Sequence, residues 1–261
     1  MVISAIVFFI GTLIGSFLNV VIDRIPANRS IIRGRSHCDF CKHVLGPRDL
    51  VPIISFLLLR GRCRFCHKKI SVQYPLVELF TGSLFLGVFA TYVTSQYLSV
   101  KGLFIQLLPS WVLISCFIVI FVTDLKYTLI PDEVIILSGI AAFILIGGSG
   151  DGRAIWENLV SGGIFSLIFF FLFFITRGKG MGFGDVKLSF VLGLILGLPR
   201  IIIAFYLSFL TGAIVSLILL LQGKKKLKST IPFGPFLVVG TVIAYVWGDT
   251  LWVLFKRIVG I

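Results

Sequence analysis

Residues 103–123 read LFIQLLPSWVLISCFIVIFVT and contain no charged side chain. A helix needs about 20 apolar residues to cross the hydrocarbon core of a bilayer, so this stretch is long enough to span a membrane. The whole chain has 57% hydrophobic and 13% charged residues, which is outside the range of soluble domains. The sequence therefore predicts an all-α, polytopic membrane protein.

Seven further apolar runs bring the expected number of transmembrane helices to about eight. They lie at 2–22, 75–95, 132–149, 158–176, 185–198, 200–222 and 233–255. The run at 185–198 is short, and a re-entrant segment is the alternative there. The first run has no basic region before it and no small-residue cleavage site after it, so we expect a retained helix rather than a signal peptide.

The positions of Lys and Arg predict the orientation of these helices. With eight spans and an outside N-terminus, 19 of the 24 basic residues fall in cytoplasmic segments, as the positive-inside rule requires. A re-entrant 185–198 segment gives a poorer count, because it moves Lys224–Lys228 to the outside. The net charge of +13 then favours contact with an anionic inner leaflet. We expect no nucleic-acid partner, because the basic residues do not accompany an aromatic platform. The oligomeric state is left open.

A hydrophilic segment, residues 23–72, is expected to be a small cytoplasmic domain. It separates a first helix, 1–22, from a seven-helix membrane domain, 73–261. Two Cys-x2-Cys pairs lie in it, 21 residues apart, and four thiolates are the ligands of a structural zinc site. Zinc would supply folding free energy that a loop of this size lacks. The predicted ligands are Cys38, Cys41, Cys63 and Cys66.

Other states of these cysteines remain open. Two disulfides and unpaired thiols are the alternatives to zinc, although a reducing cytoplasm disfavours the disulfides. The three histidines, His37, His43 and His67, flank the cysteine pairs and could either replace a cysteine ligand or be solvated neighbours. Cys116, inside the predicted span 103–123, is expected to be a small apolar residue.

Two aspartates, Asp124 and Asp185, stand at the ends of predicted spans. In the eight-span topology the third span ends and the sixth begins at the cytoplasmic face, so both acids lie at one level. Asp185 could be the N-cap of its helix, but Asp124 is at a helix C-terminus, where the macrodipole disfavours a negative charge. Gly182 and Gly184 precede Asp185 and would let an extended substrate backbone approach its carboxylate.

If the two aspartates face each other, the pair holds one proton, because like charges at close range do not both ionise easily. This predicts an aspartyl protease in which Asp185 deprotonates water and Asp124 protonates the scissile carbonyl. One alternative is an ion-coupled transporter that uses these acids and Glu78 as proton carriers near the midplane. A zinc-stabilised scaffold without catalysis is another.

These residues resemble the type IV prepilin peptidase family, bacterial inner-membrane aspartyl proteases with a Gly-x-Gly-Asp motif. The match runs along most of the chain and includes both cysteine pairs. Its other segments are Gly15-Ser16-Phe17-Leu18-Asn19-Val20-Val21, Arg24-Ile25-Pro26, Leu58-Leu59-Arg60-Gly61-Arg62-Cys63, Tyr74-Pro75-Leu76-Val77-Glu78, Asp124-Leu125, Ile130-Pro131-Asp132 and Gly182-Phe183-Gly184-Asp185-Val186-Lys187-Leu188.

The resemblance implies that Asp124 and Asp185 are the catalytic pair. It also implies that the substrates are prepilins or pseudopilins, cleaved at the cytoplasmic face after the glycine of a short basic leader. Family members with the cysteine loop N-methylate the new N-terminal residue with S-adenosylmethionine, so this methyl donor is expected beside zinc, with its binding residues unknown.

Three further charged residues lie in segments that match the family. Glu78 and Lys187 are candidate accessory residues. For Glu78, a functional role and an ion pair with a loop Arg or Lys are equally open, since an intramembrane acid is a functional candidate by default. Asp132 is expected to be an N-terminal acid of the fourth span.

Overall fold

The structure is a computed structural model that describes residues 2–94, 102–148, 150–223 and 231–259, and this part of the chain is helical with no strand. A 3₁₀ turn (Pro47–Asp49) lies in the hydrophilic loop, and a π-helical turn (Leu103–Leu107) leads into α5. The α-helices are α1 (Val2–Arg24), α2 (Ile54–Leu58), α3 (Gln73–Thr94), α5 (Leu108–Tyr127), α6 (Asp132–Gly147), α7 (Gly152–Ile175), α8 (Phe183–Leu196), α9 (Arg200–Leu221) and α10 (Gly234–Val259). The predicted all-α fold is confirmed.

In the described part of the chain, each apolar run predicted to cross the membrane is helical over most of its length. Among the described residues, six helical stretches are long and apolar enough to span a bilayer, so the chain is a multi-pass membrane protein. α6 and α8 have only 16 and 14 residues, which is about 24 and 21 Å of helix. The count of eight spans therefore stays a prediction. The Lys224–Lys228 run used to orient the helices lies outside the described residues.

Two compact units make up the chain, residues 1–119 and 120–261. The boundary falls inside α5, so the last two turns of this helix, which carry Asp124, belong to the second unit. The functional division predicted above, with a loop domain at 23–72 and a seven-helix peptidase domain at 73–261, remains a prediction.

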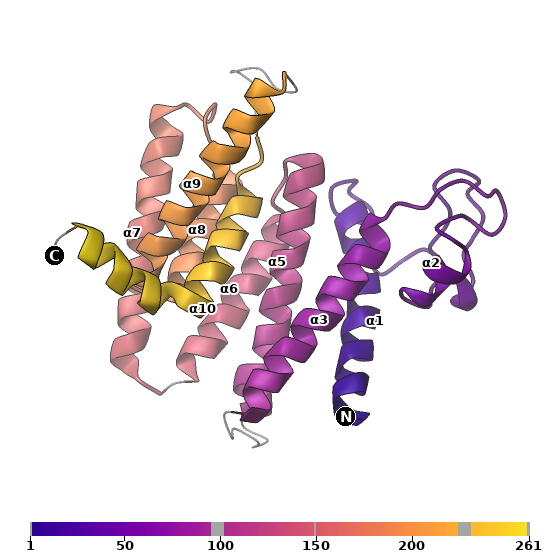
Figure 1. The fold of residues 1–261 in the computed structure, drawn as a ribbon, viewed down its shortest axis with the longest axis horizontal. Coiled ribbons are helices and arrows are strands. Elements are labelled where there is room, and N and C mark those ends of the chain that lie inside the picture. Colours follow the sequence, from indigo (N-terminus) through magenta and orange to yellow (C-terminus); the bar gives the residue numbers. More distant parts are fainter. Residues whose placement is uncertain (1, 95–101, 149, 224–230, 260–261) are drawn as a thin grey trace. The chain divides into compact units, whose positions relative to one another are not determined.

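In the first unit α1 and α3 pack side by side because glycines line their contact (Figure 1). A Cβ atom on Gly11 would lie 2.7 Å from the Cα of Gly82, and one on Gly15 would lie 2.7 Å from the Cα of Glu78. Small residues at such contacts let membrane helices approach closely. The hydrophilic loop joins the cytoplasmic ends predicted for these two helices.

The centre of the second unit is α8, which packs against α6, α7, α9 and α10. Its Leu188 and Leu192 are almost completely buried, and a Cβ atom on Gly193 would lie 2.4 Å from the Cα of Gly162 on α7. The outward residues of the surrounding helices are apolar, such as Phe174, which is 70% exposed. A helix with apolar side chains both on the face toward the bundle and on the face away from it is suited to contact with lipid.

Candidate active site and metal centre

The four cysteines predicted to bind zinc lie together in the first unit. Their Sγ atoms are all within 4.8 Å of one another, and those of Cys38 and Cys66 are 3.8 Å apart. A tetrahedral zinc with Zn–S bonds of about 2.3 Å would place its sulfurs about 3.8 Å apart. All four are free thiols rather than disulfides. The number, type and spacing of the ligand atoms therefore fit a structural zinc ion.

Each cysteine pair folds into the same tight turn. In residues 38–43 and again in residues 63–68, the N–H of the first residue donates to the carbonyl of the sixth at 2.9 Å. The residues after the second cysteines, Lys42 and His67, have φ angles of 58° and 56°, in the left-handed region. This conformation is uncommon outside glycine and reverses the chain so that both thiols of a pair point the same way.

The two turns contact each other through their phenylalanines. The ring centroid of Phe65 lies 3.6 Å from that of His43, and the ammonium of Lys68 lies 4.8 Å from the ring centroid of Phe40. The phenylalanine of each turn, which is its third residue, thus contacts the sixth residue of the other turn. The two turns are therefore related by a local pseudo-two-fold axis. All three histidines of the loop are exposed, and the ligand cluster in the described residues contains cysteines alone.

The thiols differ in how readily they lose their protons. Backbone N–H groups of Cys66 and Phe65 favour the thiolate of Cys63 and lower its pKa to about 7. At Cys66 the N–H of Lys68 has the same effect, but burial and the neighbouring thiols outweigh it and raise the pKa to about 11. A bound zinc ion would hold all four sulfurs as thiolates.

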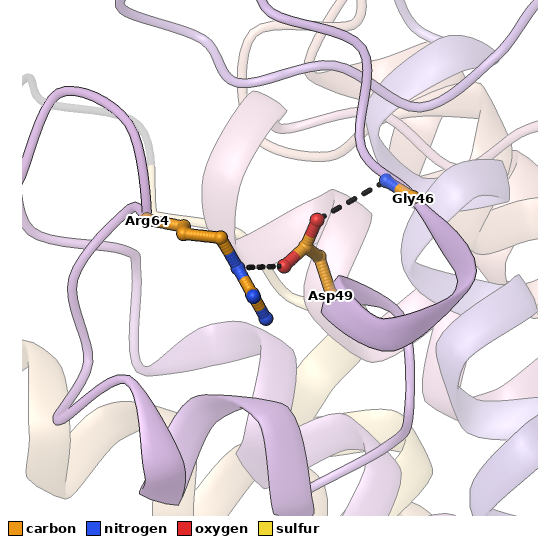
Figure 2. A network of polar contacts seen from close by, with 3 residues as sticks. All are labelled: Gly46, Asp49 and Arg64. Carbon is orange, nitrogen blue, oxygen red and sulfur yellow. Dashed lines mark hydrogen bonds and ion pairs between the residues drawn. The ribbon is translucent and has the colours of Figure 1, made fainter.

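Polar contacts within the loop connect the cysteine turns to the rest of the first unit. The carboxylate of Asp49 accepts from Nε of Arg64 at 2.7 Å and from the N–H of Gly46 at 3.2 Å (Figure 2). Arg24, the last residue of α1, donates to four backbone carbonyls in residues 30–35 at 2.9 to 3.4 Å. The membrane helix therefore anchors the start of the loop.

Glu78 connects the loop to α3 through a backbone N–H. Its Oε2 accepts the backbone N–H of Ile53 at 2.7 Å, and the side chain is buried. Ile53 precedes α2 and has a φ of 61°, so its N–H is turned toward the carboxylate. Of the two roles left open for Glu78, the ion pair with a loop Arg or Lys is thus replaced by a hydrogen bond to backbone.

In the second unit Asp124 lies in the last turn of α5 and is 5% exposed. Its Oδ2 accepts the backbone N–H of Gly234, the first residue of α10, at 2.8 Å. A negative charge is favoured at a helix N-terminus and disfavoured at a C-terminus. The N-terminus of α10 therefore offsets the unfavourable effect of the C-terminus of α5 on the Asp124 carboxylate. The structure thereby supplies the stabilisation that the sequence position of Asp124 lacks.

Asp185 is the third residue of α8, and Gly182 is the N-cap. The N-cap role considered for Asp185 is therefore wrong in detail: its Oδ2 reaches back to accept the N–H of Gly182 at 3.2 Å. Its Oδ1 is buried and has no hydrogen-bond partner in the described part of the chain. Asp124 lies close enough for its charge to act on this carboxyl.

The side chain of Ile130 lies beside the start of α8, which carries Asp185, and the start of α10, whose N–H bonds Asp124. A Cβ atom on Gly184 would lie 3.0 Å from the Cβ of Ile130, and one on Gly234 would lie 3.2 Å from its Cδ1. Gly184, predicted to admit a substrate backbone, thus has Ile130 on its open side, whereas Gly182 is exposed. Sequence reasoning missed Ile130 and Gly234 as neighbours of the site. The available signals were the family-matching segment that contains Ile130 and the two prolines, Pro232 and Pro235, that flank Gly234.

Lys187, the second accessory candidate, pairs with Asp132. Its Nζ donates to both carboxylate oxygens, at 2.7 and 2.8 Å, and lies 5.1 Å from the ring centroid of Phe183. Asp132 is the first residue of α6, as predicted. The ion pair therefore joins the beginnings of α6 and α8 close to Asp185.

Comparison with known proteins identifies the family of the chain. Residues 9–92 match the Bacterial Peptidase A24 N-terminal domain, and residues 111–217 match the Type IV leader peptidase family. A prepilin leader peptidase/N-methyltransferase of Bacillus subtilis is 35% identical over 249 residues, which is 95% of each chain. This chain belongs to the type IV leader peptidase family. The predicted resemblance is confirmed.

Other relatives of this leader peptidase carry the same name. The Aeromonas hydrophila protein is 33% identical over 95% of this chain and 91% of its own length. The protein of Pseudomonas aeruginosa is 30% identical over 93% of this chain and 89% of its own. No solved structure matches the chain. Membership in a peptidase family favours the protease hypothesis over the transporter and the scaffold.

Proposed function

We propose that this leader peptidase removes the short basic leader from type IV prepilins or pseudopilins, with Asp124 and Asp185 as the catalytic pair. The observation that carries the proposal is the convergence of two buried carboxylates from α5 and α8, close enough for their charges to interact. Two such acids, of which one keeps a proton, are what an aspartyl protease needs. The relatives' shared name supplies the substrate class.

The proposed reaction adds one water molecule across a peptide bond. Asp185 accepts a proton from water through its unpartnered Oδ1 while the water oxygen bonds to the scissile carbonyl carbon, and Asp124 gives its proton to the carbonyl oxygen. The tetrahedral intermediate then breaks its carbon–nitrogen bond, and the nitrogen takes up the proton held by Asp185. One hydroxyl of the intermediate returns its proton to Asp124 as the carboxylic acid forms, so the pair again holds one proton. The two residues act as one coupled pair.

The cysteine loop is proposed to serve the second activity in the relatives' name, N-methylation of the new N-terminal residue. Cys38, Cys41, Cys63 and Cys66 would hold zinc, whose part is to fold the loop. S-adenosylmethionine would be the methyl donor. Tritium transfer from it to a cleaved pilin tests this half, and complete cleavage without incorporation would leave a peptidase alone.

The proposed location is the bacterial inner membrane, with both activities at its cytoplasmic face. The distribution of Lys and Arg supports this orientation, and the basic loop suits an anionic inner leaflet. At this face a soluble leader can reach the aspartates while the hydrophobic helix behind it stays in lipid.

Co-expression with a prepilin tests the peptidase proposal. The mass of the pilin reports leader removal in the wild type and in the Asp124→Asn and Asp185→Asn variants. Each asparagine keeps the size of the side chain but can neither accept nor give the catalytic proton, so uncleaved prepilin is expected in both.

A further inference from the structure

The first turn of α10 belongs to the peptidase site although it contributes no acid. Gly234 donates its N–H to Oδ2 of Asp124 at 2.8 Å, and the bond is buried. It joins residues 110 positions apart, from the end of one helix to the start of another. A hydrogen bond to a carboxylate is stronger than one between neutral groups, so this bond strengthens as Asp124 gives up its proton, and it fixes the orientation of the acceptor.

The segment around Gly234 is built so that this N–H is held in place. Pro232 and Pro235 have no N–H of their own. Phe233 packs its ring against those of Phe209 and Phe169, with centroid distances of 5.0 and 6.2 Å. The aromatic contacts anchor the residue before Gly234 and therefore set the direction of its N–H.

Gly234 also leaves no room for a side chain. A Cβ atom there would lie 2.8 Å from Oδ2 of Asp124 and 3.2 Å from Cδ1 of Ile130. The first contact is closer than real Cβ atoms approach an oxygen, so either the carboxylate or the backbone would have to move. Glycine is thus required for the space beside the donor, whereas any residue except proline would supply the N–H itself.

We propose that Gly234 is a positioning residue of the peptidase site: its N–H occupies Oδ2 of Asp124, so that the reaction uses Oδ1. The proton that Asp124 gives to the scissile carbonyl then resides on Oδ1, and Oδ2 stays fixed as an acceptor. This inference rests on the proposed catalytic role of Asp124. Gly234 touches neither water nor substrate in this scheme.

The sharpest test removes the donor without adding an atom. Cell-free synthesis into nanodiscs can place glycolic acid at position 234, which replaces the amide between Phe233 and Gly234 by an ester. We expect kcat for prepilin cleavage to fall on the order of 10-fold, the usual effect of losing a hydrogen bond to a charged group, with KM unchanged. An unchanged kcat, or a change confined to KM, would overturn the proposal.

A steric variant and a matched control complete the experiment. Gly234→Ala keeps the N–H but displaces the carboxylate, so kcat should fall about 100-fold. In Gly248→Ala the added Cβ would lie 2.9 Å from Cγ of Arg200, which stresses the packing of the same helix away from Asp124. Its kcat per folded enzyme should stay near wild type. If Gly248→Ala loses as much as Gly234→Ala, the effect is general packing and the proposal is wrong.

Asp124→Asn is measured beside these variants to separate the two hypotheses. If it still cleaves prepilin, the proposed function fails. If it is inactive while the ester variant cleaves normally, the dyad stands and only the role of Gly234 fails. Because the ester adds no bulk, it decides the matter even if Gly234→Ala does not fold.

Discussion

Glu78 is a buried acid whose partner is a backbone N–H rather than a basic side chain. The bond to Ile53 fixes the start of α2 against α3. A buried N–H left without an acceptor destabilises a fold by about 1–3 kcal/mol. At the residue scale, the structure therefore favours a role for Glu78 in holding the cysteine loop.

Replacing Glu78 separates this role from a catalytic one. Glu78→Ala leaves the Ile53 N–H unpaired and should make the loop lose zinc to a chelator more readily, whereas Glu78→Gln keeps an acceptor oxygen and should retain zinc. Prepilin cleavage should be normal in both, because the aspartates lie in the other unit. Zinc retention combined with lost cleavage in Glu78→Ala would show a direct role in catalysis.

The Lys187–Asp132 ion pair is a second test at this scale. Both side chains are partly exposed, at 36% and 61%, so the pair contributes less than about 1 kcal/mol to stability. We nevertheless expect Lys187→Met to slow cleavage several-fold, because the pair keeps Ile130 against the start of α8. Exchanging the two residues, Lys187→Asp with Asp132→Lys, should restore part of the rate. A normal Asp132→Asn beside an inactive Lys187→Met would instead mean that the lysine meets the substrate.

At the scale of elements, the contact of α7 with α8 decides where Asp185 lies. Gly193→Ala would force its Cβ to within 2.4 Å of the Cα of Gly162, and overpacking of this kind costs about 1–3 kcal/mol. We expect a lower melting temperature together with slower cleavage. Gly163→Ala, next to that contact but facing open space, is the matched control and should behave as wild type. Equal effects of the two substitutions would contradict this account.

The helices and the cysteine turns could be predicted because each depends on a local pattern. An uncharged stretch of about 20 residues specifies a membrane helix, and two Cys-x2-Cys pairs specify a metal site, with little need for the rest of the chain. The short lengths of α6 and α8 could not be predicted in this way. α8 is enclosed by neighbouring helices and therefore need not match the thickness of the bilayer by itself. Hydropathy does not report such enclosure.

The parts of the site that could not be predicted depend on contacts between distant segments. The N–H of Gly234 is 110 residues from Asp124, and the partner of Glu78 is a backbone group, which leaves no trace in the sequence. Charge alone therefore suggested a basic side chain beside Glu78. Gly184 was singled out to admit a substrate backbone, which stays a prediction, and the neighbour found beside it in the structure, Ile130, is set by packing between distant segments.

At the scale of the whole molecule, the cysteine cluster and the two aspartates belong to different compact units. Removal of zinc should therefore impair methyl transfer, which is assigned to the cysteine loop, but not leader cleavage, which is assigned to the aspartates. A structural zinc contributes on the order of 10 kcal/mol to the folding of a small domain, so Cys38→Ser with Cys63→Ser should abolish zinc binding and methyl transfer. Leader cleavage should persist. Loss of cleavage in parallel with zinc content would show that the peptidase site depends on the loop.

The most direct test of the central claim is the mass of a prepilin after incubation with wild-type enzyme and with the Asp124→Asn and Asp185→Asn variants in nanodiscs. Asp151→Asn, at the exposed N-cap of α7, is the matched control. We predict leader removal by the wild type and the control, and a rate lower by on the order of 10³-fold or more in each of the other two. Cleavage at the wild-type rate by either Asp124→Asn or Asp185→Asn would contradict the account.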